Sequence, residues 1–588
     1  MSLLAFLIVC AAGAAIGLVD GDSGPASGRV GRLAGLGGLL AAMLAALFID
    51  STTRLSFADV TLAGSEYSGR FLACAAGSGL VLSLVALASG WSDRLAPAAL
   101  ASFAGLAVAV TAVDPGVALA AAAAATTAGA IVLGREVAGS DSDGRLAEMR
   151  TIGLVAAVFL GASLALSHPA WNGPSASPAF VLGFCGLGIG LAVRSGAVPF
   201  HVPAVRMGLS GGRFSPALLL VWIPAGLGIV TISWSATTFG MRSDWLDAAV
   251  AAAQVVAVAT IVLGALAALV HDELEEIVTY SIVADAGFVL LALAARNEAA
   301  AEPARMWLLA FIAAKTGLVA WAAAVSRAFG TSKLGRLHGW LRRTPLLGLA
   351  LLAVVIATLG WPGSPVSEAR STLVQLALPG GLQFVLPAAI ILSLAYTGRL
   401  LIVGLLSPAT EVAAARGEMP HWGSRAAATP EPASADETGA AAGNKAAATA
   451  TGTDSGPSNA SVSLPAATGG PNATSRLLQR LASVWQLNRT LEASLAVVVG
   501  ASVAVAIAFG GFGTSDASQF GIPLDTAARA TPTPPPPPTL AVTPTPEPTL
   551  APHSTALPTN SPGPSQSAGP STSAAPVKTA VPVHGPGN

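Results

Sequence analysis

The sequence predicts an all-α polytopic membrane protein with about fourteen transmembrane helices, together with a disordered loop and a disordered tail. Of the 588 residues, 53% are hydrophobic and only 10% are charged, whereas soluble domains carry roughly a quarter charged residues. The apolar residues form runs of roughly 17 to 25, the length of helix that crosses about 30 Å of hydrocarbon. Short polar connections separate the runs, and a helix satisfies its own backbone hydrogen bonds in lipid.

The expected spans follow the apolar runs along the chain. They are residues 2–19, 30–49, 70–90, 95–113, 115–134, 151–168, 178–200, 215–238, 246–270, 277–295, 305–327, 345–362, 384–406 and 491–511. The first run lacks the basic start of a secretory signal, so we expect a helix there. The seventh and twelfth spans meet Pro199 and Pro362, which lack a backbone donor, and we expect both helices to be broken.

Five segments are expected along the chain. They are a transmembrane core at 1–406 (helices 1–13), a disordered cytoplasmic loop at 407–473, an amphipathic interfacial helix at 474–490, the last transmembrane helix at 491–511 and a Pro/Thr-rich disordered external tail at 512–588. The loop and the tail are rich in Ala, Thr, Ser, Gly and Pro, and such segments bury too little apolar surface to offset the entropy of ordering.

The distribution of Lys and Arg predicts the orientation, because cytoplasmic connections retain positive charge. Nineteen of the 30 basic residues follow odd-numbered spans, seven follow even-numbered spans and four lie inside spans or just past a break. We therefore expect a multi-pass protein of the cell (plasma) membrane with both termini external.

The overall charge and the cysteines exclude several classes of protein. The formal net charge is −1, so no net field attracts nucleic acid. Cys10, Cys74 and Cys185 all lie in apolar runs, and the histidines show no ligand spacing. We expect no disulfide framework, no metal site and no cofactor, and we find no set of nucleophile, base and orienting residue.

Charged residues inside the spans are the candidates for function, because an ionisable group in the bilayer normally faces a protein interior or a water-filled path. Arg194 lies in the seventh span, just before Pro199 and His201. A broken helix beside a charge is typical of ion pathways. The alternative is a span that ends near residue 193, with Arg194 reaching the membrane surface.

The twelfth span shows the same pattern of a break followed by charges. Pro362 is followed by Glu368 and Arg370. Here the alternative is an ordinary loop in which both side chains are solvated.

Two further charges lie well inside spans. Lys315 has apolar or small residues on both sides, Trp307 to Ala314 and Thr316 to Val325, so its side chain cannot easily reach the surface. Asp285 lies within the tenth span, with partial exposure as the alternative.

Three stretches of the sequence resemble a known family in their order and spacing. Arg194–His201 reads ArgSerGlyAlaValProPheHis where the family has Lys four residues before ValProPheHis, and Ser215-Pro216 opens the next span as in the family. Glu273–Val283 follows the family's AspLeuLysArgLeuLeuAlaTyrSerSerIle stretch, and Leu359–Gly363 leads to Arg370 where the family places a Lys. The chain is thus similar, over residues 1–406 and 491–511, to the antiporter-like membrane subunits of NADH:quinone oxidoreductase (complex I) and of Mrp cation/proton antiporters.

Other positions of this chain either match the family pattern or differ from it. Arg399 falls where the N-type subunit has an Arg, and Lys315 matches a Lys of the M- and L-type subunits. The fifth-helix Glu of the family is absent, because residues 118–130 are Ala, Leu, Thr and Gly only, and Gly226 stands near the eighth-helix Lys position.

The resemblance implies a proton- or cation-translocating subunit that works with other membrane subunits of a respiratory or antiporter complex. Arg stays charged at physiological pH, so Arg194 and Arg370 are expected to act as fixed charges. Proton exchange, if it occurs, would then fall to Lys315, Asp285, Glu368, His201 and ordered water. The rival is a non-conducting structural subunit that kept the fold, and an independent solute carrier is a third reading.

Overall fold

A computed structural model describes the chain at residues 1–20, 27–57, 60–89, 94–134, 154, 158, 178–210, 212–235, 244–406 and 473–509. The predicted span 151–168 lies outside these residues except for two positions. The predicted loop 407–473, except for its last residue, and the predicted tail 512–588 also lie outside them.

The described residues of the N-terminal part form five helices and one small hairpin. The helices are α1 (Ser2–Asp20), α2 (Ser27–Ala46), α3 (Glu66–Ser89), α4 (Leu95–Thr111) and α5 (Pro115–Gly134). Strands β1 (Arg54–Phe57) and β2 (Val60–Ala63) pair antiparallel, with Arg54 opposite Ala63. The all-α prediction did not include this hairpin, because strands of four residues leave little periodic signal.

The middle part holds the helices that form the centre of the structure. They are α7 (Pro178–Ser195), α8 (His201–Ser210), the π-helical turn η2 (Ala217–Trp222), α9 (Ile223–Ser235), α10 (Asp244–Val270), α11 (Leu274–Ala295), the 3₁₀ turn η4 (Glu298–Ala300) and α12 (Ala301–Phe329).

The C-terminal part continues with short connecting elements and further long helices. They are η5 (Leu334–Arg336), α13 (Trp340–Arg343), α14 (Pro345–Leu359), α15 (Pro365–Ala377), η6 (Gly380–Leu382), α16 (Val385–Leu405) and α18 (Ala473–Ala508). Helix α18 is continuous through the two segments that the sequence separates as an interfacial helix and a last span.

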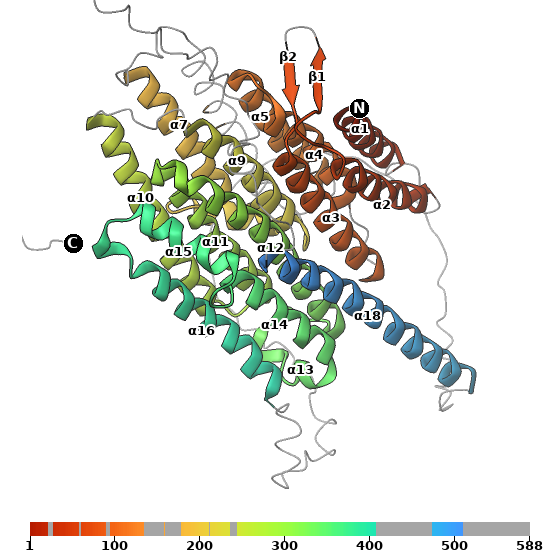
Figure 1. The fold of residues 1–588 in the computed structure, drawn as a ribbon. Coiled ribbons are helices and arrows are strands. Elements are labelled where there is room, and N and C mark those ends of the chain that lie inside the picture. The colour runs from red at the N-terminus through yellow and green to blue at the C-terminus, as the bar shows by residue number, and fades with distance from the viewer. Residues whose placement is uncertain are drawn as a thin grey trace, which may run out of the picture. The chain divides into compact units, whose positions relative to one another are not determined.

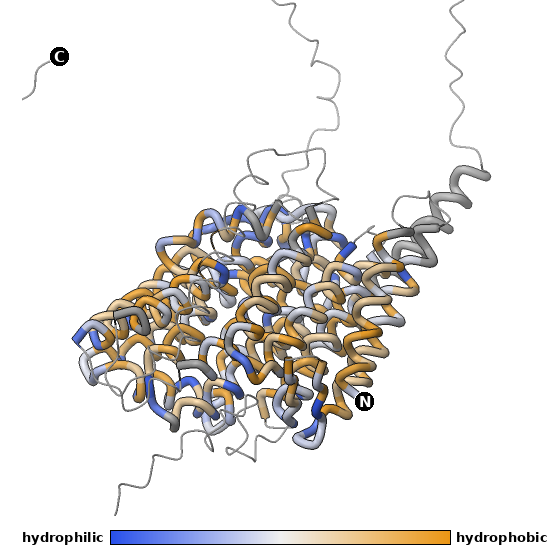
Figure 2. The backbone as a smooth tube through the Cα atoms, turned by 90° about the horizontal axis from the view of Figure 1, so that it is seen from above, coloured by the Kyte–Doolittle hydropathy of each residue, from blue (hydrophilic) through white to orange (hydrophobic). Residues whose placement is uncertain are grey.

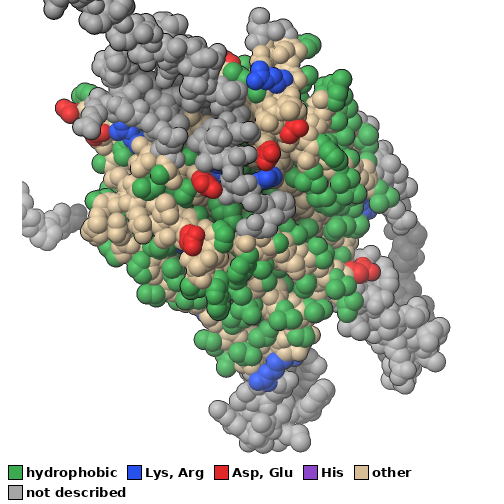
Figure 3. Space-filling model, in the orientation of Figure 1, with side chains coloured by type: hydrophobic (Ala, Val, Ile, Leu, Met, Phe, Trp, Pro, Cys, Tyr) green, Lys and Arg blue, Asp and Glu red, His purple; other side chains and the backbone are tan. Residues whose placement is uncertain are grey.

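The helices agree with a polytopic membrane protein. Seven of those described are long and apolar enough to cross a membrane by length and composition, and six shorter helices are also apolar. Thirteen predicted spans coincide with a helix, and the sixth lies outside the described residues, so the number fourteen stays a prediction. Orange, hydrophobic residues predominate along the helices in Figure 2, and charged side chains are few among the described residues on the face shown in Figure 3.

Helices α11 and α12 form the interior of the bundle. In an 18-residue apolar stretch of each helix, 100% of the residues are buried in α12 and 94% in α11. The corresponding share is 33% in α10 and in the α16 region. In Figure 1, α12 lies behind α14 and α15 and beside α18 and α9. Large apolar side chains on the outer helices, such as Val255 on α10 and Ile402 on α16, remain exposed in the structure, as expected for surfaces that face lipid.

The seventh span is broken, as the sequence predicts. Helix α7 ends at Ser195, Gly196 takes a positive φ of 71°, and α8 begins at His201 after Pro199. The N–H of Val198 in the break donates a 3.0 Å hydrogen bond to Oγ1 of Thr260 on α10. A side chain of a neighbouring helix therefore satisfies a backbone group that the break leaves open.

The twelfth span is broken as well. Helix α14 ends at Leu359, and Gly360 and Gly363 take positive φ values of 75° and 81°. Ser364 then caps α15, because its Oγ accepts a 3.3 Å hydrogen bond from the N–H of Ser367.

Candidate functional site

Lys315 and Asp285 form an ion pair in the interior of the bundle. Lys315 lies in the middle of α12, and its Nζ is 2.5 Å from Oδ2 of Asp285 on α11. The two side chains are 1% and 5% exposed. Nζ also donates to Oγ of Ser281 at 3.5 Å, and Ser281 lies one helical turn from Asp285 on the same face of α11.

The local fold explains why these residues meet. Helices α11 and α12 are consecutive and joined by the short connection around η4, so they form a helical hairpin. Asp285 and Lys315 lie at similar distances along the chain from that connection, which brings them to a similar height.

Arg370 lies at the second break and is 1% exposed. Its Nη1 donates hydrogen bonds of 3.2 and 3.1 Å to the carbonyl oxygens of Thr358 and Leu359, which end α14. A cation at a helix C-terminus satisfies open carbonyl groups and complements the helix dipole. Its guanidinium carbon lies 4.4 Å from the ring centre of Phe288 and 5.2 Å from that of Trp307.

These contacts place Arg370 beside the ion pair. Phe288 follows Asp285 by one turn on the same face of α11. The structure thus brings together three of the residues that the sequence singles out: Asp285, Lys315 and Arg370.

Arg194 and His201 flank the first break. Arg194 is fully buried in the last turn of α7. A Cβ atom at Gly196 would lie 3.2 Å from Cγ2 of Val283, so the break packs against α11. Val283 and Asp285 point to nearly opposite sides of that helix. His201 is half-buried, and its Nδ1 is a buried atom with no hydrogen-bond partner among the described residues.

The other predicted site residues lie apart from this group. Glu368 and Pro362 are exposed. Arg399 on α16 donates hydrogen bonds of 2.7 and 2.6 Å to the carbonyl oxygens of Leu269 and His271, and it pairs with Asp272. Arg399 therefore closes the C-terminal end of α10, where a cation complements the helix dipole.

A small cavity adjoins Lys315 between α12, α14 and α16. Its polar lining comes from Lys315, Thr358, Ser393, Tyr396 and Thr397, and it has room for about one water molecule. A water molecule in this cavity would lie next to the amine.

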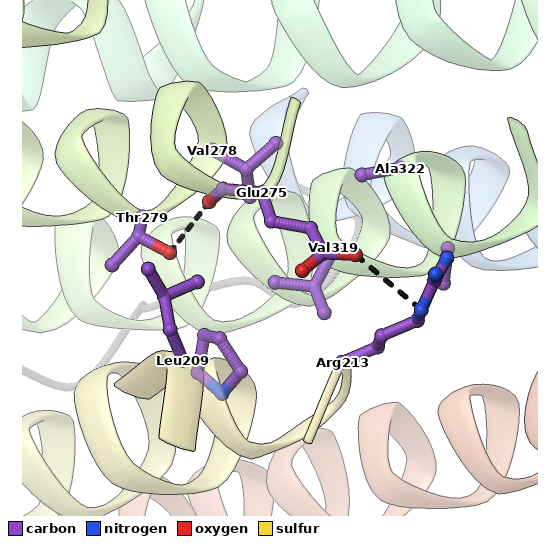
Figure 4. Close-up of a pocket in the computed structure, with 9 residues that line it drawn as sticks. Leu209, Arg213, Glu275, Val278, Thr279, Val319 and Ala322 are labelled. Atoms are coloured by element: carbon purple, nitrogen blue, oxygen red, sulfur yellow. Dashed lines mark hydrogen bonds and ion pairs between the residues drawn. The ribbon is translucent and has the colours of Figure 1, made fainter. Parts of the chain in front are cut away.

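A second cavity lies further along α11 and α12, toward Leu274 at the start of α11 (Figure 4). Arg213 and Glu275 form an ion pair across it, with Nε 3.4 Å from Oε1. Val319 also lines it, one turn along α12 from Lys315. It too has room for about one water molecule.

Sequence reasoning did not identify the pairing itself or the residues that support it. Ser281, Thr358, Phe288 and Trp307 carry no charge and stand out only through their contacts. The pair could have been found from the similar distances of Asp285 and Lys315 from the connection between their helices. Within the described ranges, no group of three His, Cys, Asp or Glu side chains could hold a metal ion.

The fold and the buried charges define a polytopic helical membrane protein with two broken helices and an ion pair in its interior. Residues 166–391 match the family described as "NADH:quinone oxidoreductase/Mrp antiporter, TM". The resemblance to the antiporter-like membrane subunits that the motifs indicate is thereby confirmed over this region.

Individual relatives agree with this assignment. Subunit N of NADH-quinone oxidoreductase from Rhodococcus opacus is 29% identical over 209 residues, which cover 34% of this chain and 37% of the relative. A chain of respiratory complex I from Thermus thermophilus superposes with a TM-score of 0.53 at 20% identity, covering 69% of this chain and 90% of that one. A chain of the Mrp complex from Dietzia sp. gives a TM-score of 0.53 at 18% identity, with 69% and 80% covered. Both structures show the fold alone, and this chain spans well under half of the curated relative.

Proposed function

We propose that this chain is a proton- or cation-translocating membrane subunit of a complex I-like or Mrp-like assembly, coupled to quinone reduction or ion exchange elsewhere in that complex. The observation that supports this proposal is the buried Lys315–Asp285 pair beside a water-sized cavity. Burying charges costs several kcal/mol per ion before pairing, and buried ionisable groups in membrane helices mark ion pathways.

The chemistry of the three charged side chains assigns their roles in the proposal. Lys315 is the group that exchanges a proton, because Arg cannot be deprotonated in proteins. Arg370 acts as a fixed positive charge, and its hydrogen bonds to the end of α14 stabilise the break in the twelfth span. Other membrane subunits of a respiratory or antiporter complex are the proposed partners.

A non-conducting structural subunit is the second candidate, and one feature favours it. A Cβ atom at Gly226 would lie 2.5 Å from Cδ2 of Leu106, so any larger side chain at the family's eighth-helix Lys position would require Leu106 to shift. Helix α5 carries no acidic residue either. This chain therefore lacks the fifth-helix Glu and the eighth-helix Lys that the resemblance leads one to expect.

Translocation by the assembled complex separates the two candidates. Lys315→Ala and Lys315→Arg are each introduced into the chain, and proton uptake is measured in membrane vesicles together with the amount of assembled complex. Translocation predicts that both variants assemble and fail to pump, because neither Ala nor Arg releases a proton. A structural subunit predicts wild-type pumping by both. Normal pumping by Lys315→Arg alone would show that the site supplies a fixed charge.

We further propose that the chain lies in the plasma membrane with both termini external. Under this proposal the segment 407–473 faces the cytoplasm and the segment 512–588 faces outward. Protease added to intact cells should then cut the second segment and spare the first. Cleavage of the first with protection of the second would reverse the orientation.

A further inference from the structure

The described interior contains more buried positive charge than negative charge. Its buried basic side chains are Arg194, Arg305, Lys315 and Arg370, and its one buried carboxylate is that of Asp285. A carboxylate in such surroundings is stabilised as an anion by the nearest cations. Two of these cations, Lys315 and Arg370, contact the face of α11 that carries Asp285.

These two cations lie on either side of Asp285 along α11. Lys315 contacts the Ser281–Asp285 turn, at 3.5 and 2.5 Å. The guanidinium of Arg370 lies over Phe288, about 4.5 Å further along the helix axis from Asp285 at 1.5 Å per residue. One carboxylate is therefore placed between an amine that can lose its proton and a guanidinium that cannot.

Arg370 also has donors to spare. Its Nη1 is engaged by the carbonyl groups of Thr358 and Leu359. Its Nε and Nη2 are buried and have no hydrogen-bond partner among the described residues. A buried donor without a partner costs free energy, so this side of the guanidinium favours an incoming acceptor.

We propose that Asp285 is a switching counter-ion, paired with Lys315 while the amine is protonated and turned to Nε or Nη2 of Arg370 once the amine is neutral. This inference rests on the proposed function, since it describes how Lys315 is discharged. Thr358 contacts both cation sites. Its carbonyl oxygen accepts a hydrogen bond from Arg370, and Thr358 also lines the cavity beside Lys315.

The proton balance is simple. The Lys315 ammonium gives one proton to a water in the cavity lined by Thr358, Ser393 and Tyr396, and it becomes a neutral amine. Asp285 stays an anion throughout and changes only its partner. The charge of the three side chains falls from +1 to zero, and return of a proton to Lys315 restores the first pairing.

Arg370 decides where the proton goes. Without it, the carboxylate would be the nearest acceptor, and the proton would pass from Lys315 to Asp285 and stay inside the pair. The unpartnered Nε and Nη2 of Arg370 offer the carboxylate a second partner, so in this proposal the proton leaves for the cavity instead.

A structure of the assembled complex carrying Lys315→Met tests the switch directly. Met stands for the neutral amine, because it is close in length and carries no charge. We expect an oxygen of Asp285 within about 3.2 Å of Nε or Nη2 of Arg370. An Asp285 side chain that keeps its wild-type position in this variant overturns the proposal.

A double-mutant cycle gives a second readout that does not depend on the structure. Lys315→Met and Arg370→Met each leave Asp285 one cation, whereas the double variant leaves none. The double variant should therefore lose more in Tm than the sum of the two single losses, by at least about 2 °C. In an Asp285→Asn background the same two losses should add, and additivity in both backgrounds overturns the switch.

The outcomes distinguish the switch from the proposed function. Loss of pumping in Lys315→Met with an unmoved Asp285 rejects the switch and leaves translocation standing. Undiminished pumping with Asp285 turned to Arg370 rejects translocation through Lys315 and leaves the change of partner standing.

Discussion

The indole Nε1 of Trp222 donates a 2.8 Å hydrogen bond to Oγ1 of Thr316. Trp222 ends the π-helical turn η2, and Thr316 follows Lys315 on α12. Both side chains are buried. The bond therefore fixes the irregular start of the eighth span against the central helix at the height of the ion pair.

Trp222→Phe should weaken the fold by removing this bond. The loss of a buried hydrogen bond that leaves a partner unsatisfied costs about 1–3 kcal/mol. Trp321→Phe is the matched control, because Trp321 is equally buried and its Nε1 has no hydrogen-bond partner among the described residues. Unfolding in mixed micelles should show the larger loss for Trp222→Phe. Equal losses would mean that the bond contributes nothing.

Gly360→Ala should destabilise the second break more than Gly363→Ala. Both glycines have positive φ, so each substitution carries backbone strain of about 1–2 kcal/mol. Only at Gly360 would the new Cβ also meet backbone, 2.7 Å from N of Ser367, whereas Gly363 has open space. Thermal unfolding of the purified chain measures the difference. A larger effect at Gly363 would contradict this account of the break.

Arg399→Leu should reduce stability and, under the proposed function, should leave translocation in place. The substitution removes two hydrogen bonds from a charged donor to the end of α10, and each such bond contributes about 1.5–3 kcal/mol. Arg343→Leu, at an exposed position on α13, is the control and should change stability little. Pumping per assembled complex is the deciding measurement, since its complete loss in Arg399→Leu would return Arg399 to the ion pathway.

Gly287→Ala should disturb the contact between α10 and α11. Its new Cβ would lie 2.5 Å from Cγ1 of Ile261 and 3.0 Å from the carbonyl oxygen of Ala257, so the helices would have to separate. Gly398→Ala on α16 meets nothing within 4 Å and should gain a few tenths to about 1 kcal/mol from helix propensity. We therefore expect Tm to fall for Gly287→Ala and to rise for Gly398→Ala. A stabilised Gly287→Ala variant would show that α10 and α11 have room for a methyl group at this contact.

The fold was largely predictable because bilayer thickness and backbone hydrogen bonding leave few solutions. Long apolar runs coincide with α3, α10, α11 and α12, and the prolines at 199 and 362 mark breaks that the structure contains. The β1–β2 hairpin was missed because Leu55 and Val60 lie in a polar connection with no long alternation. The continuity of α18 was missed because its polar first half and its apolar second half differ in composition rather than in conformation.

The site was predictable only as a set of residue types. Asp285, Lys315 and Arg370 stood out because charges are rare in spans, yet single-helix patterns do not say which charges on different helices face each other. Glu368 and Arg370 are close in sequence, but one is exposed and the other buried, since they occupy different faces of α15. The hydrogen bonds of Arg399 were not predictable for the same reason, because they go to carbonyl groups at the end of α10 that sequence patterns do not locate.

The burial of the central stretch of α12 limits how membrane lipids can affect Lys315. The apolar stretch of α12 that carries Lys315 is enclosed by other helices, so lipid could act on the amine only by shifting those outer helices. Under the proposed function, the proton step at Lys315 is thereby insulated from membrane composition. If the proposed function holds, a change of host membrane should alter how well the chain is retained in its assembly before it alters proton exchange at Lys315.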